Sequence, residues 1–490
     1  MDPRPNPAVL SGPTREEDGR SATKIVATIG PASESRLEAL IEAGVSVARL
    51  NFSHGEEADH RRRVPAIREA ARSRGVAVGI LADIQGPKLR LGRLAGGELA
   101  LEAGQEVRLI EGDQAQVPGE IAFHFPGFLE SVEPGHRLFL ADAAIELVVA
   151  RIEAGAVVAR VRRGGRIGDR QGVHLPDSSF GFVLPTEQDR SHIALAQELE
   201  IDMLGISFVS RAEEVEHIRE LAPGMIMVAK IERRAALENL RSILEVSDGV
   251  MIARGDLGVE VQLEQLPLVQ KSIIQEALRS GRFVITATEM LESMVRASRP
   301  TRAEVADVAN AVLDGTDAVM LSAETAIGAY PVEAVAAMSR ISRAVETSQR
   351  YLELPRVSFR ESEPTFSNAT ALAAAQAAEA LDIRRIICFT ESGNTVRLLS
   401  RYRPDAEIIA LTPSQRTLHA MTILSRVRPL LCERATSLEE MLHAAQTMLL
   451  ERGLALQGEE VIFVAGVPPG VSRSTNVMKL HRIGELTRLH

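Results

Sequence analysis

The chain is poor in aromatic residues and in cysteine. Among its 490 residues there are no tryptophans, three tyrosines and two cysteines. So few aromatic rings argue against a surface that works by aromatic stacking. Cys388 and Cys432 both lie in apolar runs, which is typical of buried, reduced thiols, and this cysteine usage fits a reducing cytosol. We therefore expect a cytoplasmic protein.

Basic charge and long apolar runs are also lacking. Acidic residues outnumber basic ones by 66 to 56, which gives a formal net charge of −10. An acidic chain is a poor candidate for non-specific binding of nucleic acid. If the chain binds phosphates, it must bind them locally, with a few Arg or Lys and a metal ion. No run approaches the ~18 apolar residues of a membrane span. We expect neither nucleic acid nor a membrane as a partner.

The length of the chain predicts two to four domains, because 490 residues are too many for one hydrophobic core. Residues 1–20 are rich in Pro, Gly and charge, which predicts a disordered tail, and their apolar stretch is too short for a signal peptide. Beyond them, apolar β-type runs alternate with helical patterns. Strands are predicted at 23–30, 45–52, 76–83, 203–208, 225–232, 249–256, 283–290 and 318–324.

Eight strands that alternate with helices predict a (β/α)8 TIM barrel, here made of residues 21–88 and 186–350. The alternation breaks at 89–185, where short β-type runs and many glycines predict an inserted small β-barrel domain. After a linker-like stretch, residues 351–490 predict a C-terminal α/β domain with a parallel sheet, whose final strand is 460–466.

Polar side chains gather where the predicted barrel strands end. In a TIM barrel these carboxyl ends meet at one face and carry the active site. Single polar residues at strand ends are common, but so many at one barrel mouth indicate a functional site. They are Arg49, Asn51, Ser53, Asp83, Ser207, Lys230, Glu232, Asp256, Thr288 and Glu324.

The stretch Val228–Glu260 carries the strongest signal. Lys230 and Glu232 point the same way because strand side chains alternate, and Asp256 is expected at the end of the next strand. A structural salt bridge is one interpretation. The other is Mg²⁺ held by two carboxylates, with Lys230 stabilising charge on a phosphoryl group or an enolate. Gly255 would let a ligand approach the backbone.

Three other motifs are weaker on their own. Arg49 lies in the motif ARLNFSHG, and its guanidinium suits bidentate phosphate contact. A lone Thr at a strand end, such as Thr288, is more often structural. The loop Thr390–Thr395, TESGNT, combines hydroxyls, a glycine and a predicted helix start, so it is either a phosphate cradle or an ordinary N-cap turn.

Taken together, these motifs give the chain a resemblance to pyruvate kinase along residues 23–482. The matching stretches include TKIVATIGPAS, ARLNFSHG, DIQGPKLR, DGVMIARGDLGVE, RPTRAEVADVANAVLDG and MLSAETAIGAYP, in family order. The resemblance implies transfer of phosphate from phosphoenolpyruvate to ADP, giving pyruvate and ATP in the last step of glycolysis. It also implies a homotetramer, with the inserted domain as a lid and the last domain as a regulatory one.

The resemblance also implies roles for single residues. Mg²⁺ or Mn²⁺ would be held by Glu232 and Asp256, and the substrate carboxylate would be contacted by Gly255, Asp256 and Thr288. Lys230 would stabilise the transition state, and Arg49 would bind the phosphoryl group. The residues on the nucleotide side would be Asn51, His54, Arg90 and Arg170.

Two further expectations concern ions and effectors. Many members of the family bind K⁺ near the positions of Asn51, Ser53, Asp83 and the Ile84 carbonyl, but this chain has Lys88 where those members have Glu. It therefore resembles the K⁺-independent branch, and we hypothesise that K⁺ is dispensable. A phosphorylated activator is expected at the TESGNT loop, with contacts from Thr390, Ser392, Asn394 and Thr395, and at the segment 473–476.

Two alternatives are weighed against this interpretation. A Mg²⁺-dependent barrel lyase acting on a keto acid would also need Glu232 and Asp256, but it would not need Arg49, Arg90 or a lid, and it would not consume ADP. A catalytically silent regulator would bind metabolites through the last domain alone. The presence of Lys230 with both carboxylates argues against it.

Overall fold

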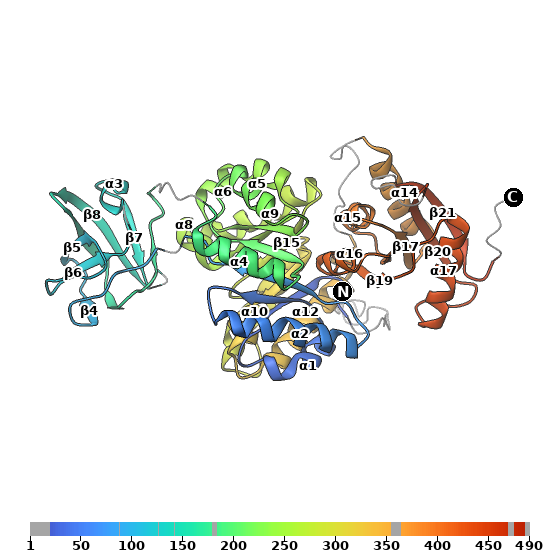
Figure 1. Cartoon of the computed structure of the whole chain (residues 1–490), viewed down its shortest axis with the longest axis horizontal. Helices are drawn as coiled ribbons and strands as arrows, with labels where there is room; N and C mark the ends of the chain where they lie inside the picture. The colour runs from blue at the N-terminus through green and yellow to red at the C-terminus, as the bar shows by residue number, and fades with distance from the viewer. Residues whose placement is uncertain are drawn as a thin grey trace, which may run out of the picture.

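The computed structural model describes residues 20–87, 89–125, 127–141, 143–178, 184–353, 364–468 and 475–485. The predicted tail, apart from Arg20, and Lys88 lie outside these ranges. Three bodies follow one another along the long axis (Figure 1): an all-β part at one end, a barrel in the middle and an α/β part at the other end. Within the described ranges, no helix is both long and apolar enough to cross a membrane.

The central body is a closed barrel of eight parallel strands, as predicted. Their order around the barrel is β1-β16-β15-β14-β13-β12-β3-β2. The strands are almost entirely buried, because side chains fill the interior and helices cover the outside. Their bounds are β1 (Lys24–Thr28), β2 (Val45–Asn51), β3 (Gly79–Ile84), β12 (Met203–Ile206), β13 (Ile226–Ile231), β14 (Gly249–Ala253), β15 (Phe283–Ala287) and β16 (Ala318–Leu321).

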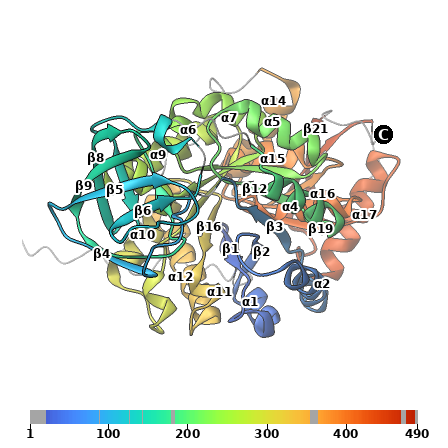
Figure 2. The same cartoon turned by 60° about the vertical axis from the view of Figure 1, so that its left-hand side comes forward.

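Helices pack around the barrel between successive strands (Figure 2). They are α1 (Leu37–Ala43), α2 (Glu57–Ser73), α4 (Glu187–Glu198), α5 (Ala212–Leu221), α6 (Arg234–Glu238), α7 (Leu240–Val246), α9 (Leu266–Arg279), α10 (Arg302–Leu313) and α12 (Pro331–Glu346). Short helices α8 (Arg254–Glu260) and α11 (Ala323–Ala326) follow β14 and β16, and α13 (Gln349–Leu352) follows α12.

Most barrel strands end earlier than the sequence predicts, and at three of them, β14, β15 and β16, this changes the local setting of the site. β14 stops at Ala253, so Gly255 and Asp256 lie in the first turn of α8, where a carboxylate is favoured by the helix dipole. β15 stops at Ala287, because Thr288 turns the chain with φ of 68°. Glu324 lies on α11 rather than on β16. All three segments nevertheless follow the carboxyl ends of barrel strands.

The inserted segment forms a six-stranded sheet in the order β11-β7-β8-β9-β5-β6 and a two-stranded sheet of β4 and β10. The larger sheet curls around its own apolar core as a half-barrel rather than a closed barrel (Figure 2). As predicted, the described residues of this segment contain no long helix, and α3 is short. The elements are β4 (Glu98–Leu101), β5 (Glu106–Glu111), β6 (Glu120–Phe123), α3 (Phe128–Ser131), β7 (Arg137–Leu140), β8 (Ile145–Glu153), β9 (Ala156–Arg163), β10 (Gly165–Gly168) and β11 (Val173–His174).

The last body is a five-stranded sheet in the order β19-β18-β17-β20-β21. The prediction of a parallel sheet ending at 460–466 is wrong at its edge, because β21 adds an antiparallel strand beside β20. The elements are α14 (Phe366–Ala380), β17 (Arg385–Phe389), α15 (Asn394–Arg401), β18 (Glu407–Thr412), α16 (Gln415–Ala420), β19 (Val427–Leu431), α17 (Leu438–Glu451), β20 (Glu460–Gly466) and β21 (Thr475–Arg482).

This C-terminal part closes the bottom of the barrel. Interior barrel side chains such as Val26 and Met203 belong to one continuous apolar cluster with Ile423 and Leu424 of the C-terminal part. Across the junction, the guanidinium of Arg403 donates to Asp317 at 2.8 Å in a buried ion pair. With the amino ends of the strands covered, the carboxyl ends remain as the open face of the barrel.

Candidate active site

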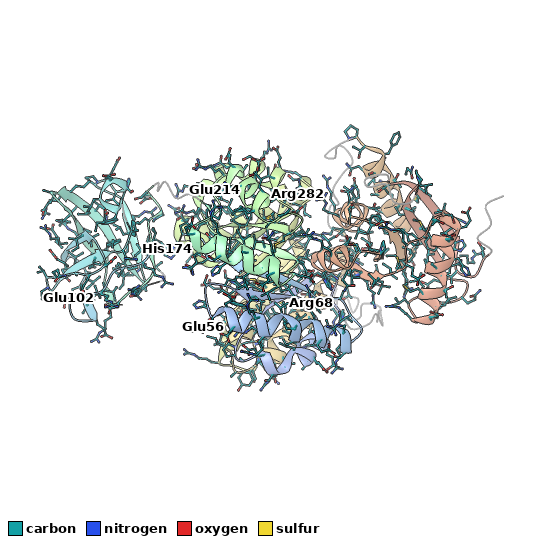
Figure 3. All side chains as sticks on the ribbon, in the orientation of Figure 1. Glu56, Arg68, Glu102, His174, Glu214 and Arg282 are labelled. Carbon is teal, nitrogen blue, oxygen red and sulfur yellow. The ribbon has the colours of Figure 1, made fainter. Side chains whose placement is uncertain are left out.

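A cavity of about 200 Å³ lies at the carboxyl ends of the barrel strands. Residues 172–175 of the inserted part form one of its walls, and His174 lies between the two bodies (Figure 3). The cavity brings together residues from five barrel strands or the loops that follow them. Those named from the sequence are Arg49, Asn51, Ser53, His54, Asp83, Ser207, Lys230, Glu232 and Asp256.

Lys230 lies at the centre of the polar network in the cavity. Its ammonium contacts Glu232 at 2.8 Å and Asp83 at 3.1 Å, and it donates to the Ser207 hydroxyl at 2.7 Å. Burial alone would lower the pKa of Lys230, but the two carboxylates outweigh it and raise this pKa above the ordinary value. Lys230 is therefore a fixed positive charge in a largely buried position.

Arg49 is the second cation of the network. Its Nε donates to Asp83 Oδ2 at 2.8 Å, and its Nη1 donates to the Thr28 hydroxyl at 2.9 Å. Burial would raise the pKa of Asp83, but Lys230 and Arg49 together hold it below its usual value. Asp83 thus remains ionised and fixes both cations in place.

Two carboxylates that follow the neighbouring strands β13 and β14 supply the negative side of the cavity. Glu232 is buried, and its Oε2 accepts the backbone N–H of Phe208 at 2.7 Å. Burial raises the pKa of Glu232, Lys230 opposes that shift, and the nearby Asp256 carboxylate adds to it. Two carboxylates this close repel each other, and a divalent cation bound between them would offset that repulsion.

Thr288 and Gly255 are joined directly. The Gly255 N–H donates to the Thr288 hydroxyl at 2.8 Å, and that hydroxyl donates to the Ala287 carbonyl at 2.7 Å. Neither residue lines the cavity itself. A Cβ on Gly255 would lie no closer than 3.7 Å to Thr288, so no neighbouring atom of the chain requires glycine here.

Comparisons with known proteins agree with this geometry. The family description "Pyruvate kinase, barrel domain" matches residues 20–335, and "Pyruvate kinase, alpha/beta domain" matches residues 368–481. A pyruvate kinase of Methylorubrum extorquens is 43% identical over 474 residues, which cover 96% of this chain and 98% of the relative. One of Geobacillus stearothermophilus is 41% identical over 473 residues, or 95% of this chain and 81% of the relative.

The chain belongs to the pyruvate kinase family. It is a phosphotransferase with pyruvate kinase activity, which moves phosphate from phosphoenolpyruvate to ADP. Members of this family generally use a divalent metal. Among the described residues no group of three or more His, Cys, Asp and Glu side chains could hold a metal by itself. Glu232 and Asp256 nevertheless suit one, because they offer only oxygen donors and leave positions for substrate and water.

The positions expected on the nucleotide side of this pyruvate kinase separate into two groups. Asn51 and His54 line the cavity. Arg90 and Arg170 lie together at the root of the inserted part, where Arg90 Nη1 donates to the Arg170 carbonyl at 3.1 Å, but neither lines the cavity.

At the expected K⁺ position, oxygens of Asn51, Asp83 and Ile84 already have partners. Asn51 Oδ1 accepts the Ser53 N–H at 3.1 Å, and the Ile84 carbonyl accepts the Ser207 hydroxyl at 2.7 Å. Asp83 contacts two cations of the chain. Lys88 lies outside the described residues, although its neighbours Pro87 and Leu89 both line the cavity.

The TESGNT loop joins β17 to α15. Gly393, with φ of 80°, donates its N–H to the Thr390 hydroxyl at 2.9 Å, and Ser392 is exposed. Thr395 shares a 2.5 Å hydrogen bond with Thr475, so β21 meets the loop. Asn394 accepts from Arg397. Residues 473 and 474 of the second expected effector segment lie outside the described ranges.

Two corrections concern residues at the barrel mouth. Glu324 was expected there with the polar group, but it is fully buried and accepts the backbone N–H groups of Leu291 and Ser322, so it holds loops in place. Arg254 was missed. Its guanidinium donates to the Thr288 carbonyl at 2.6 Å and to Asp307 at 2.8 Å. The available signal was a cation close to the carboxyl end of a buried strand: Arg254 directly follows β14, and Arg49 lies near the end of β2.

Proposed function

We propose that the cavity at the barrel mouth is the site of phosphate transfer, with Lys230, Glu232 and Asp256 as its centre. The observation that carries the proposal is the buried Lys230 ammonium, which contacts the carboxylates of Glu232 and Asp83. Arg49 binds the same Asp83. Phosphoryl transfer needs positive charge held in a fixed position more than it needs covalent chemistry. These residues provide such charge without further rearrangement.

Glu232 and Asp256 would hold Mg²⁺ or Mn²⁺ together with oxygens of the substrate and water. When bound, the metal would neutralise negative charge on the phosphoryl oxygens. Glu232 is oriented for this task by the Phe208 N–H on one oxygen and by Lys230 on the other. The carboxylate of phosphoenolpyruvate would lie against Gly255, Asp256 and Thr288, where the missing side chain of Gly255 leaves room.

Lys230 and Arg49 would bind the transferring phosphoryl group. Because Asp83 and Glu232 hold the ammonium between them, Lys230 stays protonated and can stabilise the charge that develops in the transition state or on the enolate. Asn51 and His54 would lie on the nucleotide side, and Arg90 and Arg170 would join them if the inserted part closed as a lid. Closure would exclude water, so that phosphate passes to ADP rather than to water.

A coupled assay with phosphoenolpyruvate, ADP and Mg²⁺ tests this assignment. We expect ATP to form with the wild type and not with Glu232→Gln or Asp256→Asn, while Glu324→Gln, if folded, should keep its chemistry because its carboxylate binds backbone groups only. Formation of pyruvate without ATP would indicate a lyase, and binding without turnover would indicate a silent regulator. Full activity of both metal-site variants would contradict the assignment.

We propose that K⁺ is dispensable because Lys88 supplies the charge. In support, both oxygens of Asp83 already contact cations of the chain, and the residues flanking Lys88 line the cavity. Turnover in tetramethylammonium buffer should be nearly the same with and without K⁺, and Lys88→Glu should introduce K⁺ dependence. A manyfold rise of the wild-type rate with K⁺ would contradict the proposal.

We further propose a regulated, cytoplasmic homotetramer. A phosphorylated activator would bind the TESGNT loop, where Ser392 is exposed and the backbone turns at Gly393. Both cysteines are free, as expected for the cytoplasm. Turnover against phosphoenolpyruvate concentration, with AMP and phosphosugars added in turn, tests the effector. Unchanged curves for every compound, or equal activation of a Ser392→Asp variant, would contradict this site.

A further inference from the structure

Arg233 is a cavity residue to which the roles above assign nothing. It follows Glu232 directly and lines the cavity beside it. Its guanidinium lies over the ring of Phe208, 5.7 Å from the ring centre, within the range of a cation–π contact. The backbone N–H of the same Phe208 orients Glu232. Arg233 and Glu232, which would hold the metal, therefore both contact Phe208.

The Arg233 guanidinium interacts with two neighbouring residues, Phe208 and Glu260. Phe208 packs against Gly86, which has φ of 65° and lies where the chain leaves the barrel for the inserted part; a Cβ on Gly86 would be only 2.9 Å from the Phe208 ring. The second neighbour is Glu260 at the end of α8, whose carboxylate interacts electrostatically with Arg233. Both Arg233 and Glu260 line the cavity, and residues 172–175 of the inserted part line it as well.

The other cations of the cavity are committed deeper in the barrel. Lys230 and Arg49 are held by Asp83 and Glu232, at the position proposed for phosphoenolpyruvate. The second substrate, ADP, would then bind between these buried cations and residues 172–175, which form the wall of the cavity on the inserted part. A diphosphate that enters there would meet Arg233 on the barrel side. A guanidinium presents a planar fork that fits two phosphate oxygens, and stacking on a ring keeps that fork oriented.

We propose that Arg233 is a substrate-binding residue that contacts the diphosphate of ADP. The proposal rests on the family activity and adds one residue to the nucleotide site. The competing interpretation is that Arg233 only pairs with Glu260 and supports the cavity wall. The two differ in a measurable way, because a structural pair affects stability, whereas a phosphate contact affects the affinity for one of the two substrates.

Three variants separate these interpretations. Arg233→Met keeps the length of the side chain without charge, Arg233→Lys keeps the charge without the fork, and Arg234→Met is the matched control on the exposed next residue. We expect Arg233→Met to raise the KM for ADP about tenfold, with kcat and the KM for phosphoenolpyruvate changed by less than about twofold. Arg233→Lys should lie between the wild type and Arg233→Met, and Arg234→Met should match the wild type.

Calorimetric binding of MgADP without phosphoenolpyruvate gives a second measurement that needs no turnover. Its Kd should rise by a factor similar to that of the KM. The proposal is overturned if Arg233→Met leaves ADP affinity unchanged, if it lowers only the melting temperature, or if it raises the KM for phosphoenolpyruvate instead. Should Arg233→Met fail to fold, Arg233→Lys decides, because a lost bidentate contact should still weaken MgADP binding severalfold.

Discussion

At the scale of single residues, strand periodicity predicts where side chains point but not which partners they find. It places Lys230 and Glu232 on one face, and they do touch. The contacts of Lys230 with Asp83 and Ser207 depend on how the barrel closes. Arg254 was missed for the same reason, since it reaches the Thr288 carbonyl and Asp307, 34 and 53 residues away along the chain.

Replacing Lys230 should separate catalysis from metal binding. Lys230→Ala removes the charge that would stabilise the phosphoryl group, so turnover should fall by orders of magnitude, while Glu232 and Asp256 should still bind Mn²⁺ in a titration followed by electron paramagnetic resonance. The variant also removes the cation beside Glu232 and one of the two cations beside Asp83, and breaking a buried pair in this way typically costs ~3–5 kcal/mol of stability. Lys230→Arg retains the charge and serves as the control for this loss. Near-normal turnover of a folded Lys230→Ala protein would refute the role given to Lys230.

At the scale of elements, the sequence predicts the existence and order of the barrel strands well and their ends poorly. The strand predicted at 249–256 includes Arg-Gly-Asp after the apolar run, but β14 ends at Ala253 and α8 begins at Arg254. Positive φ at Thr288 ends β15 although threonine itself favours strands. Such ends are set by tertiary hydrogen bonds, for example from Arg254 and from Gly255 to Thr288, and a single-sequence pattern does not contain them.

Helix α2 supplies a pH-dependent contact beneath the ARLNFSHG loop. His60 of α2 stacks on Phe52 with ring centres 4.3 Å apart, and His192 of α4 meets the same ring edge-on at 5.4 Å. Burial, and then the positive charge of Arg63, lower the pKa of His60 to about 4, while Asp59 opposes the shift. Burial also lowers the pKa of His192, against the charge of Asp189.

The lowered pKa of His60 makes the stability of the folded chain depend on pH. The folded pKa of His60 lies below its ordinary value of 6.5, so the unfolded chain takes up the proton first. The contribution to stability is complete above about pH 6.5 and is lost as the pH falls toward 4, with a loss on the order of 1–2 kcal/mol between pH 7 and 5. His60→Phe keeps a ring on Phe52 without titrating. Its melting temperature should therefore fall less than that of the wild type between pH 7 and pH 5, and equal slopes would contradict the assignment.

At the scale of the whole molecule, composition and the break in alternation predict three bodies but not how they meet. The apolar residues that meet the barrel, such as Ile423 and Leu424, lie in a short connection between α16 and β19. In the sequence, the same residues could belong to the core of the C-terminal part alone, so the junction has no sequence signal of its own. Its polar contacts, such as Arg403 with Asp317, again join residues far apart in the chain. β21 was missed for a similar reason. It is an edge strand, and it is held in the sheet by pairing with β20.

That edge strand also bears on assembly. β21 lies at the end of the C-terminal sheet in the described chain, and pairs with β20 on one side only. Met478 and Leu480 of β21 are 37% and 50% exposed, and they point to the same face because they are two residues apart. An edge strand that exposes apolar side chains is a template for pairing with another chain. We therefore expect β21 to form one of the contacts of the proposed homotetramer.

A single added charge should test this contact. Leu480→Lys places an ammonium on the exposed edge, where a second chain would have to bury it, so light scattering after size exclusion should show dimers in place of tetramers. Leu456→Lys is the matched control, since Leu456 is 74% exposed but lies outside the sheet, and it should remain tetrameric. Each dimer should still turn over substrate, because the cavity of each subunit lies at the opposite end of the barrel from the C-terminal part. A Leu480→Lys protein that stays tetrameric would mean that the subunits meet elsewhere.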